Sequence, residues 1–395
     1  LGASGEVTAT GFTGTLDGIL GSGTPAAANV TTLGASGEVT ATGFTGTLDG
    51  VLGGGTPAAA TVTTLAASGD LTANNFAGKN RIINGAMVID QRNAGAAVST
   101  AGNFAVDRWF MQRGGAAVFS LGQSTTVPAG FYNSIVATVT TAAALGSGEY
   151  YDIQQNIEGL NLLDLNWGTA NAATVTLSFW VRSSVAGVYS FQFRNSASNR
   201  SIVYNYTIET VNTWQQITQT IAGDTSGTWL NTNGIGIGLI IPLGTGSNFT
   251  TATTGTWQAG NFNASTSALT TWQATLSNTF YITGVQLEKS STATEFDHRS
   301  VGTELALCKR YYTTSDGDLY TGLLGFGLSS AAGAFRDAGY FPTSMRAAPT
   351  MAYTNLASGW SAFNINSTLT HYTVELSKTT ADARPNYQFT ASAEL

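Results

Sequence analysis

The chain has 395 residues, of which only 10% are charged, and its formal net charge is −7. This negative charge disfavours sequence-independent binding to nucleic acid or to an anionic bilayer. No apolar run approaches the about 20 residues of a membrane-spanning helix, and a single cysteine, Cys308, excludes an intrachain disulfide. The 47 glycines and the many β-branched residues predict a mainly β chain with many turns.

The first 64 residues are a tandem repeat. Residues 1–32 and 33–64 align without gaps and differ at only three positions, and a shortened third copy occupies residues 65–78. Each unit has few large apolar side chains. Ordering its backbone costs about 1–2 kcal/mol per residue, whereas burying one large apolar side chain contributes about 1.5–3 kcal/mol. One unit therefore has too small a core to fold alone.

We expect residues 1–78 to form a homotrimeric fibrous shaft, in which each chain supplies a third of every core layer. Repetition of this kind is typical of a structural unit stacked along an axis. No lysine or arginine occurs before Lys79, so few long side chains keep the chains apart. The alternative is a flexible linker rich in Gly, Thr and Ala, but the recurrence of Phe, Leu and Ile in phase favours the shaft.

Alternating apolar and polar residues dominate the chain after Lys79. Segments 173–183, 187–195 and 279–289 each place large apolar side chains on one face. In segment 234–242, with the sequence GIGIGLIIP, isoleucine and leucine take one face and glycines the other. Period-two segments separated by turns are typical of an antiparallel sandwich. We predict that residues 79–297 form one jelly-roll-like β-sandwich.

Residues 298–312 have a helical pattern. Leu305, Cys308 and Tyr312 recur at the spacing of one helix face, so we expect a short helix or connector here. Two packings remain open: three such helices meet on a three-fold axis, or each helix packs on the sandwich of its own chain. Residues 313–395 are predicted to form a small, β-rich C-terminal tip domain.

Motifs for metal or nucleophilic chemistry are absent. The sequence has only two histidines, His298 and His371, and no HExxH, CxxC, GxSxG or P-loop pattern. We therefore predict neither a metal nor a cofactor. The enzymatic alternative is a glycan depolymerase, which needs two carboxylates about 5–9.5 Å apart. The candidate acids are Glu149, Asp152 and Glu158, with Tyr150 and Tyr151 as sugar-stacking rings beside them, or Asp316 and Asp318.

Aromatic residues in polar, turn-rich segments are the binding candidates. Sugars are held by aromatic rings against their C–H faces and by hydrogen bonds from Asn, Asp, Gln, Ser and Thr side chains. The alternative for each ring is a place in the core or at the edge of a sheet. The glycan-binding candidates are Trp229, Trp257, Trp272, Tyr340, Trp360, Tyr372 and Tyr387.

Three segments resemble the tail fibres of tailed bacteriophages of the cyanophage and marine-phage kind. GKNRIINGAMVIDQRNAG, residues 78–95, together with DRW, resembles the start of their receptor-binding region. Residues 279–312, from TFYITGVQLEK to CKRYY, resemble the segment that closes their sandwich, and GTPAAA(N/T)VTTL resembles their shaft repeats. The resemblance implies a homotrimeric fibre with a carbohydrate-binding-module-like sandwich. It covers most of residues 1–312, and residues 313–395 resemble nothing that we can place.

The resemblance implies a viral tail fibre in the virion, assembled in the host cytoplasm. We expect it to attach to the host cell by recognising a surface polysaccharide such as lipopolysaccharide, without cleaving it. Because Leu1 is not a start methionine, we expect an N-terminal part that docks on other tail proteins to precede this sequence. We expect no nucleic-acid partner and no membrane insertion. The alternatives are a tailspike-type glycan depolymerase, either glycosidase or lyase, and a bacterial surface adhesin of similar build.

Overall fold

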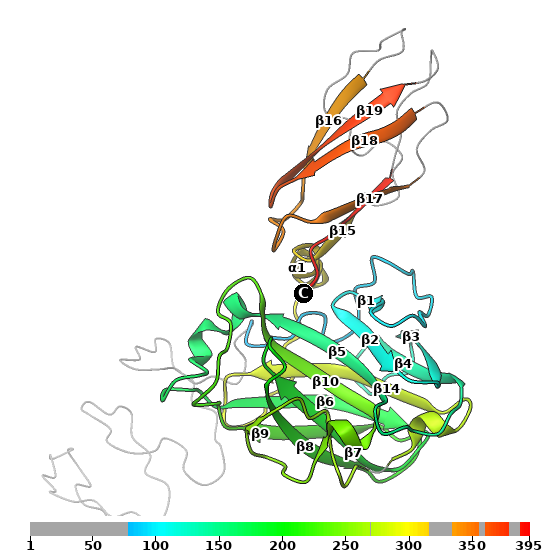
Figure 1. The fold of residues 1–395 in the computed structure, drawn as a ribbon, viewed down its shortest axis with the longest axis vertical. Helices are drawn as coiled ribbons and strands as arrows, with labels where there is room; N and C mark the ends of the chain where they lie inside the picture. Colours follow the sequence, from blue (N-terminus) through cyan, green and yellow to red (C-terminus); the bar gives the residue numbers. More distant parts are fainter. Residues whose placement is uncertain (1–77, 269, 316–333, 355–359, 379–387) are drawn as a thin grey trace, which may run out of the picture. The chain divides into compact units, whose positions relative to one another are not determined.

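The structure is a computed structural model, and it describes residues 78–268, 270–315, 334–354, 360–378 and 388–395 (Figure 1). The repeats of the predicted shaft lie outside the described residues, so the shaft, the trimer and the domain boundaries stay predictions. The described part is mainly β, with several antiparallel sheets, and this confirms the predicted class. Within these ranges, no helix has the length and apolar character that crossing a membrane requires.

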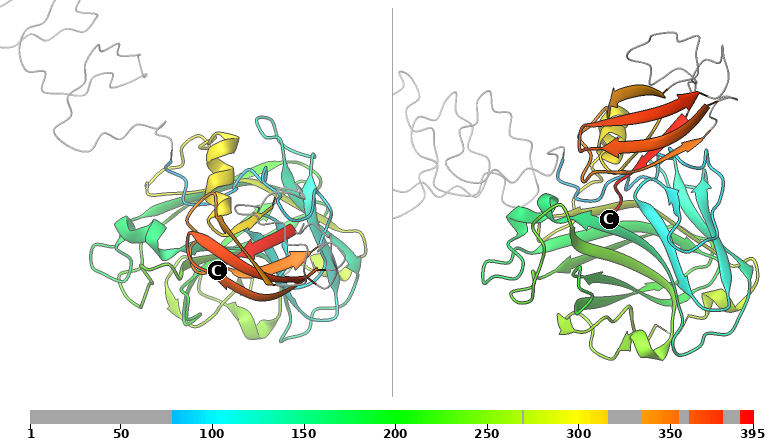
Figure 2. Two further views of the ribbon diagram at one scale, coloured as in Figure 1. Left: turned by 90° about the horizontal axis from the view of Figure 1, so that it is seen from above. Right: turned by 45° about the horizontal axis from the view of Figure 1, so that its top comes forward.

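Residues 104–288 form two large sheets whose apolar faces share one core (Figures 1 and 2). The seven-stranded sheet has the order β1 (Phe104–Val106), β2 (Trp109–Gly114), β5 (Tyr150–Glu158), β10 (Ile235–Thr245), β7 (Gly187–Arg194), β8 (Arg200–Ile208) and β12 (Gln258–Ala259). The five-stranded sheet has the order β3 (Val118–Ser124), β4 (Ser134–Thr141), β14 (Thr279–Glu288), β6 (Val175–Ser183) and β9 (Gln215–Ile221). These two layers form the predicted sandwich, and its jelly-roll description stays a prediction.

Short elements connect these strands. A two-stranded parallel pair joins β11 (Thr250–Thr251) to β13 (Ala264–Ser265). Three 3₁₀ helices are η1 (Gly159–Leu165), η2 (Ser247–Phe249) and η3 (Trp272–Ala274). Of these, η1 follows β5 directly, and η2 begins the long segment that leads to β12 and β13.

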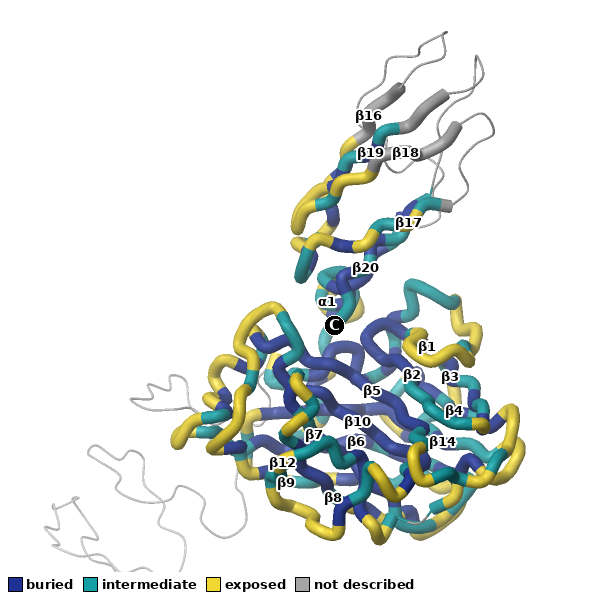
Figure 3. The backbone as a smooth tube through the Cα atoms, viewed as in Figure 1, coloured by how far each residue is buried: buried dark blue, intermediate teal, exposed yellow. Residues whose placement is uncertain are grey.

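The period-two pattern predicted the core side chains of the central strands. Val175, Leu177, Phe179 and Val181 of β6 are all buried in the core, and so are the aromatic residues of β7 that alternate with polar ones. Side chains alternate between the two faces of a strand, so a sandwich strand sends every second residue inward. Figure 3 shows β5 and β10 as two of the most continuously buried strands. The first isoleucine of β10, Ile235, is only half-buried, which corrects its predicted place in the core.

The glycines of β10 make room for η1. A Cβ atom at Gly236 would be 2.6 Å from Leu162 Cδ1 and 2.7 Å from Gly159 Cα. Only glycine allows η1 to approach the sheet this closely. The GIGIGL segment is therefore a strand that is covered by a helix, and it has no phosphate-binding loop.

The predicted helix exists as α1 (Val301–Lys309). Ser300 caps it, because its side chain accepts a hydrogen bond from the Thr303 backbone N–H. Cys308 is buried with Ile83 of the same chain, so α1 packs on its own chain, as the second of the two predicted packings has it. The meeting of three helices on an axis stays a prediction. Tyr312 is also not helical, because it begins β15 (Tyr312–Thr314).

The C-terminal residues add two three-stranded sheets. One has the order β15, β20 (Gln388–Ser392) and β17 (Thr350–Thr354). The other has the order β16 (Ala334–Tyr340), β19 (His371–Lys378) and β18 (Trp360–Ser367). Both are antiparallel, as the prediction of a β-rich C-terminal part requires.

Candidate functional site

Two of the predicted tryptophans belong to a cluster of three, which we call the tryptophan cluster. The ring of Trp167 lies 5.0 Å from that of Trp229 and 5.2 Å from that of Trp257, and the latter two are 5.1 Å apart. All three pairs meet edge to face, which is a favourable arrangement of aromatic quadrupoles. The structure thus brings Trp229 and Trp257 together, and adds Trp167, which the sequence analysis did not select.

The indole N–H groups of the tryptophan cluster all bind the protein itself. Trp167 donates to the Ala173 carbonyl at 2.8 Å, and Trp257 donates to the Ala222 carbonyl at 2.9 Å. Trp229 donates to Asp224 Oδ2 at 3.2 Å. The cluster therefore fastens the loops around residues 222–231 and 256–258 to the sandwich, and it keeps no indole donor for a ligand.

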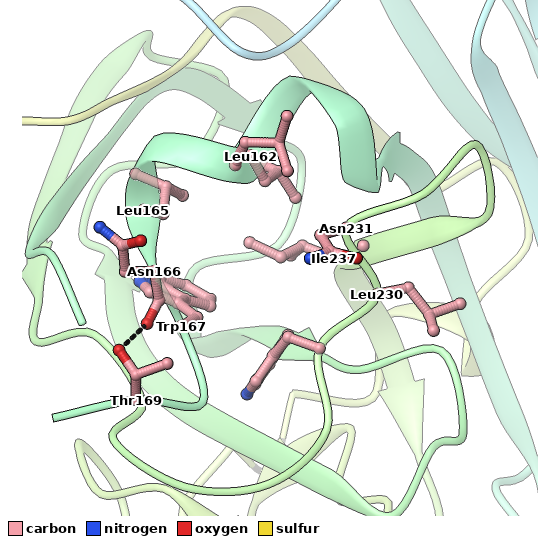
Figure 4. Close-up of a pocket in the computed structure, with 11 residues that line it drawn as sticks. Leu162, Leu165, Asn166, Trp167, Thr169, Leu230, Asn231 and Ile237 are labelled. Carbon is pink, nitrogen blue, oxygen red and sulfur yellow. Dashed lines mark hydrogen bonds between the residues drawn. The ribbon is translucent and has the colours of Figure 1, made fainter. Parts of the chain in front are cut away.

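A small cavity of about 140 Å³ lies beside the cluster (Figure 4). Leu162 and Leu165 of η1 line one side of it, and Leu230 and Ile237 line the other. The lining is mostly leucine, isoleucine and tryptophan, which gives little hydrogen bonding to a polar ligand. Its size and lining make this cavity a poor fit for a glycan.

Two predicted contact residues are core residues instead. Trp272 is fully buried, and its ring packs against the edge of Phe119 at 5.8 Å between centroids. Tyr372 is 2% exposed and packs against Phe389 at 4.8 Å. Neither ring is accessible to a glycan, so both candidates are corrected. The turn-rich sequence around Trp272 misled the prediction, because η3 places its side chain between the sheets.

The remaining predicted residues are in the C-terminal part. Tyr340 ends β16 and is 78% exposed, with its ring 6.2 Å from that of His371. The backbone of Trp360 begins β18, and its side chain lies outside the described part. Tyr387 also lies outside it. Among the predicted residues whose side chains the structure describes, therefore, only Trp229 and Trp257 are brought together.

A larger and more polar cavity, which we call the sheet cleft, lies on the outer face of the seven-stranded sheet. Its volume is about 340 Å³. Its walls come from β2, β5 and β7 and from the segment of residues 246–265. The lining residues are Gln112, Tyr150, Gln154, Arg194, Phe249, Asn261 and Asn263.

Strand alternation explains why these side chains face outward. On β5, Tyr151 and Ile153 are in the core, so Tyr150, Asp152 and Gln154 point to the other face. The same rule places Arg194 outside, since its neighbour Phe193 is in the core. A polar residue at every second position of a buried strand was thus the sequence signal for this face.

Gly238 lies beside the cleft, next to Arg194 in the ladder. It pairs with Arg194 on one side and with Asn156 on the other, and a Cβ atom there would lie 3.4 Å from both side chains. Ile240, the next residue of β10 on this face, lies between Gln154 and Gln192 in the ladder and is fully buried. The alternation of β10 predicted that its glycines and its core side chains take opposite faces, but not which side chains would surround Gly238.

The segment of residues 246–265 is fixed against the outer face of the sheet. The Phe262 N–H donates to Ser201 Oγ at 3.2 Å, and the Ser265 N–H donates to Ser190 Oγ at 3.1 Å. The segment carries Phe249, whose ring meets the ring of Tyr150 edge to face at 5.7 Å. The cleft thus has two aromatic side chains next to its Gln and Asn side chains.

A continuous hydrogen-bond network runs along the cleft. Gln154 Nε2 donates to Asp152 Oδ1 at 2.7 Å, and Gln154 Oε1 accepts from Arg194 Nη2 at 3.2 Å. Arg194 Nη1 and Gln192 Nε2 both donate to Asn261 Oδ1, each at 3.3 Å. The network fixes the positions of these side chains before any ligand arrives, which lowers the entropic cost of binding.

Three buried acceptors of this region have no partner among the described residues. They are Asp152 Oδ2, Gln192 Oε1 and Asn263 Oδ1. A buried polar atom without a hydrogen bond costs about 1–3 kcal/mol. Of the three residues, Asn263 lines the cleft, so a ligand group that donates a hydrogen bond would remove this cost for its Oδ1. The hydroxyl groups of a sugar are donors of this kind.

The electrostatics of the cleft depend on one acid and one base. Burial raises the pKa of Asp152 to about 7, against the opposing effects of its hydrogen bond from Gln154 and of the nearby Arg194 charge. Burial likewise lowers the pKa of Arg194, and the nearby Asp152 opposes this. Near neutral pH, the cleft therefore contains a fixed cation beside a carboxyl group that is only partly ionised.

The carboxylates that were considered for glycan cleavage do not form a pair. Glu149 accepts hydrogen bonds from the Gly146 N–H and the Tyr151 hydroxyl, and Glu158 binds Arg310 at 2.6 Å. Asp152 and Glu158 are six residues apart on one strand, which is about 20 Å at roughly 3.4 Å per residue. Asp316 and Asp318 lie outside the described residues. No group of three or more metal-ligating side chains occurs in the described ranges.

No protein-family model matches the chain, and no curated protein matches it. Among solved structures, it is similar in part to the enzymatically active domain of tailspike protein 4 from bacteriophage CBA120, with 14% identity and a TM-score of 0.30 over 53% of this chain and 21% of that chain. It thus spans about a fifth of that domain.

The chain is also similar in part to carbohydrate-binding modules. The family 11 module of the cellulase Lic26A-Cel5E from Clostridium thermocellum has 14% identity and a TM-score of 0.27, over 51% of this chain and 99% of that module. The module TmCBM61, solved with β-1,4-galactotriose, has 10% identity and a TM-score of 0.24, over 46% of this chain and 88% of that module.

Proposed function

We propose that the protein binds a glycan in the sheet cleft without cleaving it, and that this binding attaches a phage tail fibre to its host cell. The observation that carries the proposal is the composition of the cleft. It combines two aromatic rings, Tyr150 and Phe249, with an ordered network of amides and one guanidinium. Aromatic rings contact the apolar faces of sugars, and side-chain amides can both donate hydrogen bonds to sugar hydroxyl groups and accept them.

The unpartnered acceptor that lines the cleft, Asn263 Oδ1, favours a polyhydroxylated ligand over an apolar one. A sugar hydroxyl both donates and accepts, so it can satisfy an acceptor such as Asn263 Oδ1 while it receives a bond from another side chain. An apolar ligand would leave this oxygen unpaired. The tryptophan cluster lacks this property because its indole donors already have partners.

The non-enzymatic part of the proposal rests on the acids of the cleft. Asp152 is the one carboxyl group in the described network, and Glu149 and Glu158 are bound elsewhere by their own partners. Glycosidic cleavage by the usual route needs a second carboxyl group opposite the first. Binding, by contrast, needs only the groups already in place.

The tail-fibre part of the proposal rests on the sequence resemblance and on multivalency. Three chains in one fibre would present three clefts, and linked weak sites raise the overall affinity by about 10²–10⁴ without any new contact. Weak sugar binding at each cleft is then sufficient for attachment. The surface polysaccharide, such as lipopolysaccharide, would be the partner, and other tail proteins would hold the fibre.

The test is glycan binding by the full chain and by variants of the cleft. A panel of bacterial surface polysaccharides identifies a ligand, and titration calorimetry gives its affinity. The Asn261→Ala variant removes an acceptor that is shared by two donors, so we expect the affinity to fall at least about tenfold, or about 1.4 kcal/mol. Tyr132→Ala, which truncates a 78% exposed tyrosine outside the cleft, is the matched control.

Binding that Asn261→Ala leaves unchanged would contradict the cleft as the site. Release of new reducing ends from the bound polysaccharide would contradict the non-enzymatic part alone. Light scattering that shows a stable monomer would contradict the fibre, but it would leave glycan binding by the cleft intact.

A further inference from the structure

We propose that the sheet cleft selects a sugar that carries a carboxylate, such as a uronic acid, and that this sugar binds together with a proton taken up by Asp152. The inference rests on the proposed function, since it names the ligand class of the same cleft. It adds charge selectivity and a pH dependence, neither of which glycan binding by itself requires.

The first observation is the bonding state of Arg194. Both of its terminal nitrogens donate only to neutral amide oxygens, at 3.2 and 3.3 Å. Arg200, on the neighbouring strand, shows the contrasting state, because two of its nitrogens bind the two oxygens of Asp224, each at 2.7 Å. A guanidinium group prefers such a two-point pairing with a carboxylate. Among the described residues, none supplies that pairing to Arg194, and a ligand carboxylate would.

The second observation is the position of Asp152 in the same network. Its Oδ1 is bound by Gln154, which in turn is bound by Arg194, while its Oδ2 has no partner. When Asp152 is ionised, its charge opposes an incoming carboxylate. When Asp152 is protonated, this repulsion disappears.

Few other charges act on this pair. On the strands next to β5, the residues paired with Asp152 are the uncharged Gln112 and Pro242. The charge on β7 that acts on Asp152 is that of Arg194. On β5 itself, the neighbouring titratable residue is Tyr150, which interacts electrostatically with Arg194. The segment 246–265 contains no Asp, Glu, His, Lys or Arg. The net charge of the cleft therefore changes from about zero to +1 when Asp152 takes up a proton.

The negative charge of the whole chain does not prevent this selectivity. Exposed charges are screened beyond about 8 Å at physiological ionic strength, whereas Arg194 and Asp152 act inside a partly buried site. Proton uptake breaks no covalent bond and takes its proton from solvent. Because burial raises the pKa of Asp152 to about 7, the affinity for an anionic sugar would fall about tenfold between pH 6 and pH 8.

The test compares two probes that differ in one group, at C6 of the sugar. Methyl β-D-glucuronide carries a carboxylate where methyl β-D-glucoside carries a hydroxymethyl group. Ligand-observed NMR titration of the full chain at pH 6 and pH 8 gives both affinities. At pH 6, we expect the glucuronide to bind at least about fivefold more tightly than the glucoside. At pH 8, the glucuronide should lose most of that advantage, while the affinity for the glucoside stays constant.

Three variants assign the effect to residues. Asp152→Asn mimics the protonated acid, so we expect it to bind the glucuronide equally well at both pH values. Arg194→Gln removes the cation, so we expect the preference for the glucuronide to disappear. Arg182→Gln removes an arginine from the other sheet, and we expect it to behave as the wild type. Circular dichroism and thermal melting confirm that each variant is folded.

The outcomes separate the two proposals. Equal binding of both probes, or a pH dependence that persists in Asp152→Asn, would overturn the carboxylate inference and leave glycan binding in place. Absence of binding by both probes, with wild-type folding, would contradict the glycan-binding cleft itself.

Discussion

The tryptophan cluster and the sheet cleft belong to the same sandwich, yet their polar groups are in opposite states. In the cluster, all three indole N–H groups have hydrogen-bond partners within the chain. The rings of Trp167, Trp229 and Trp257 pack edge to face against one another. In the cleft, Asp152 Oδ2 and Asn263 Oδ1 have no hydrogen-bond partner among the described residues. Aromatic character alone therefore did not distinguish a binding surface from a structural one. The distinguishing property is hydrogen-bonding capacity that the fold leaves unused.

The strongest test of this comparison is the Trp167→Ala variant. Trp167 is 9% exposed and contacts both other rings of the cluster, so its truncation should lower the free energy of unfolding by about 3–5 kcal/mol. Urea unfolding measures this loss. Glycan affinity per folded molecule should not change. A large drop in affinity with little loss of stability would reverse the roles that we assign to the two regions.

The second test uses the pH dependence of stability in the Asp152→Asn variant. The folded-state pKa of Asp152 is raised to about 7, above its usual value of 3.8, so the folded wild type binds more protons than the unfolded chain between these values. Its free energy of unfolding therefore falls as the pH rises from about 4 to 7. Asparagine has no proton to lose, so the variant should gain stability relative to the wild type as the pH rises.

Urea unfolding at pH 4, 6 and 8 measures that difference. Some slope should remain in the variant, because burial also raises the pKa of Asp107, to about 6. A difference between variant and wild type that is the same at all three pH values would show that Asp152 titrates normally, and it would weaken the electrostatic description of the cleft.

The smallest expected effect belongs to Tyr340→Ala. Tyr340 is 78% exposed at the end of β16, and a surface substitution of this kind usually changes stability by less than about 0.5 kcal/mol. We expect glycan affinity to stay unchanged as well, measured by calorimetry against the wild type. A clear loss of affinity would place a contact in the C-terminal part and would make the sheet cleft, at most, one of two sites.

A point variant tests the C-terminal part better than its deletion does. Arg108 of the sandwich is 2% exposed and forms a salt bridge with Glu394. Deletion of residues 313–395 would remove Glu394 and so break this pair, and breaking a buried pair costs about 3–5 kcal/mol. Loss of cell binding after such a deletion would then report unfolding of the sandwich as much as loss of a site.

The sequence alone determined the β class, the inward faces of the central strands and the helix after the sandwich. These features depend on local periodicity: Val175 to Val181 alternate with period two, and Leu305 and Cys308 recur at helical spacing. The glycines of residues 234–238 alternate with core side chains in the strand, as predicted, although Ile240 follows on the same face as Gly238. Local patterns are sufficient for such features because each depends on residues that are near one another in the chain.

Only the tertiary structure decided which aromatic rings are accessible and where unused hydrogen-bonding groups gather. Trp272 and Trp229 occur in similar turn-rich segments, but one is enclosed between the sheets and the other packs at the edge of the core. Arg194 and Asn261 meet across 67 residues of chain. Whether a buried atom finds a partner depends on the pairing of distant strands, which a single sequence does not encode in any local pattern.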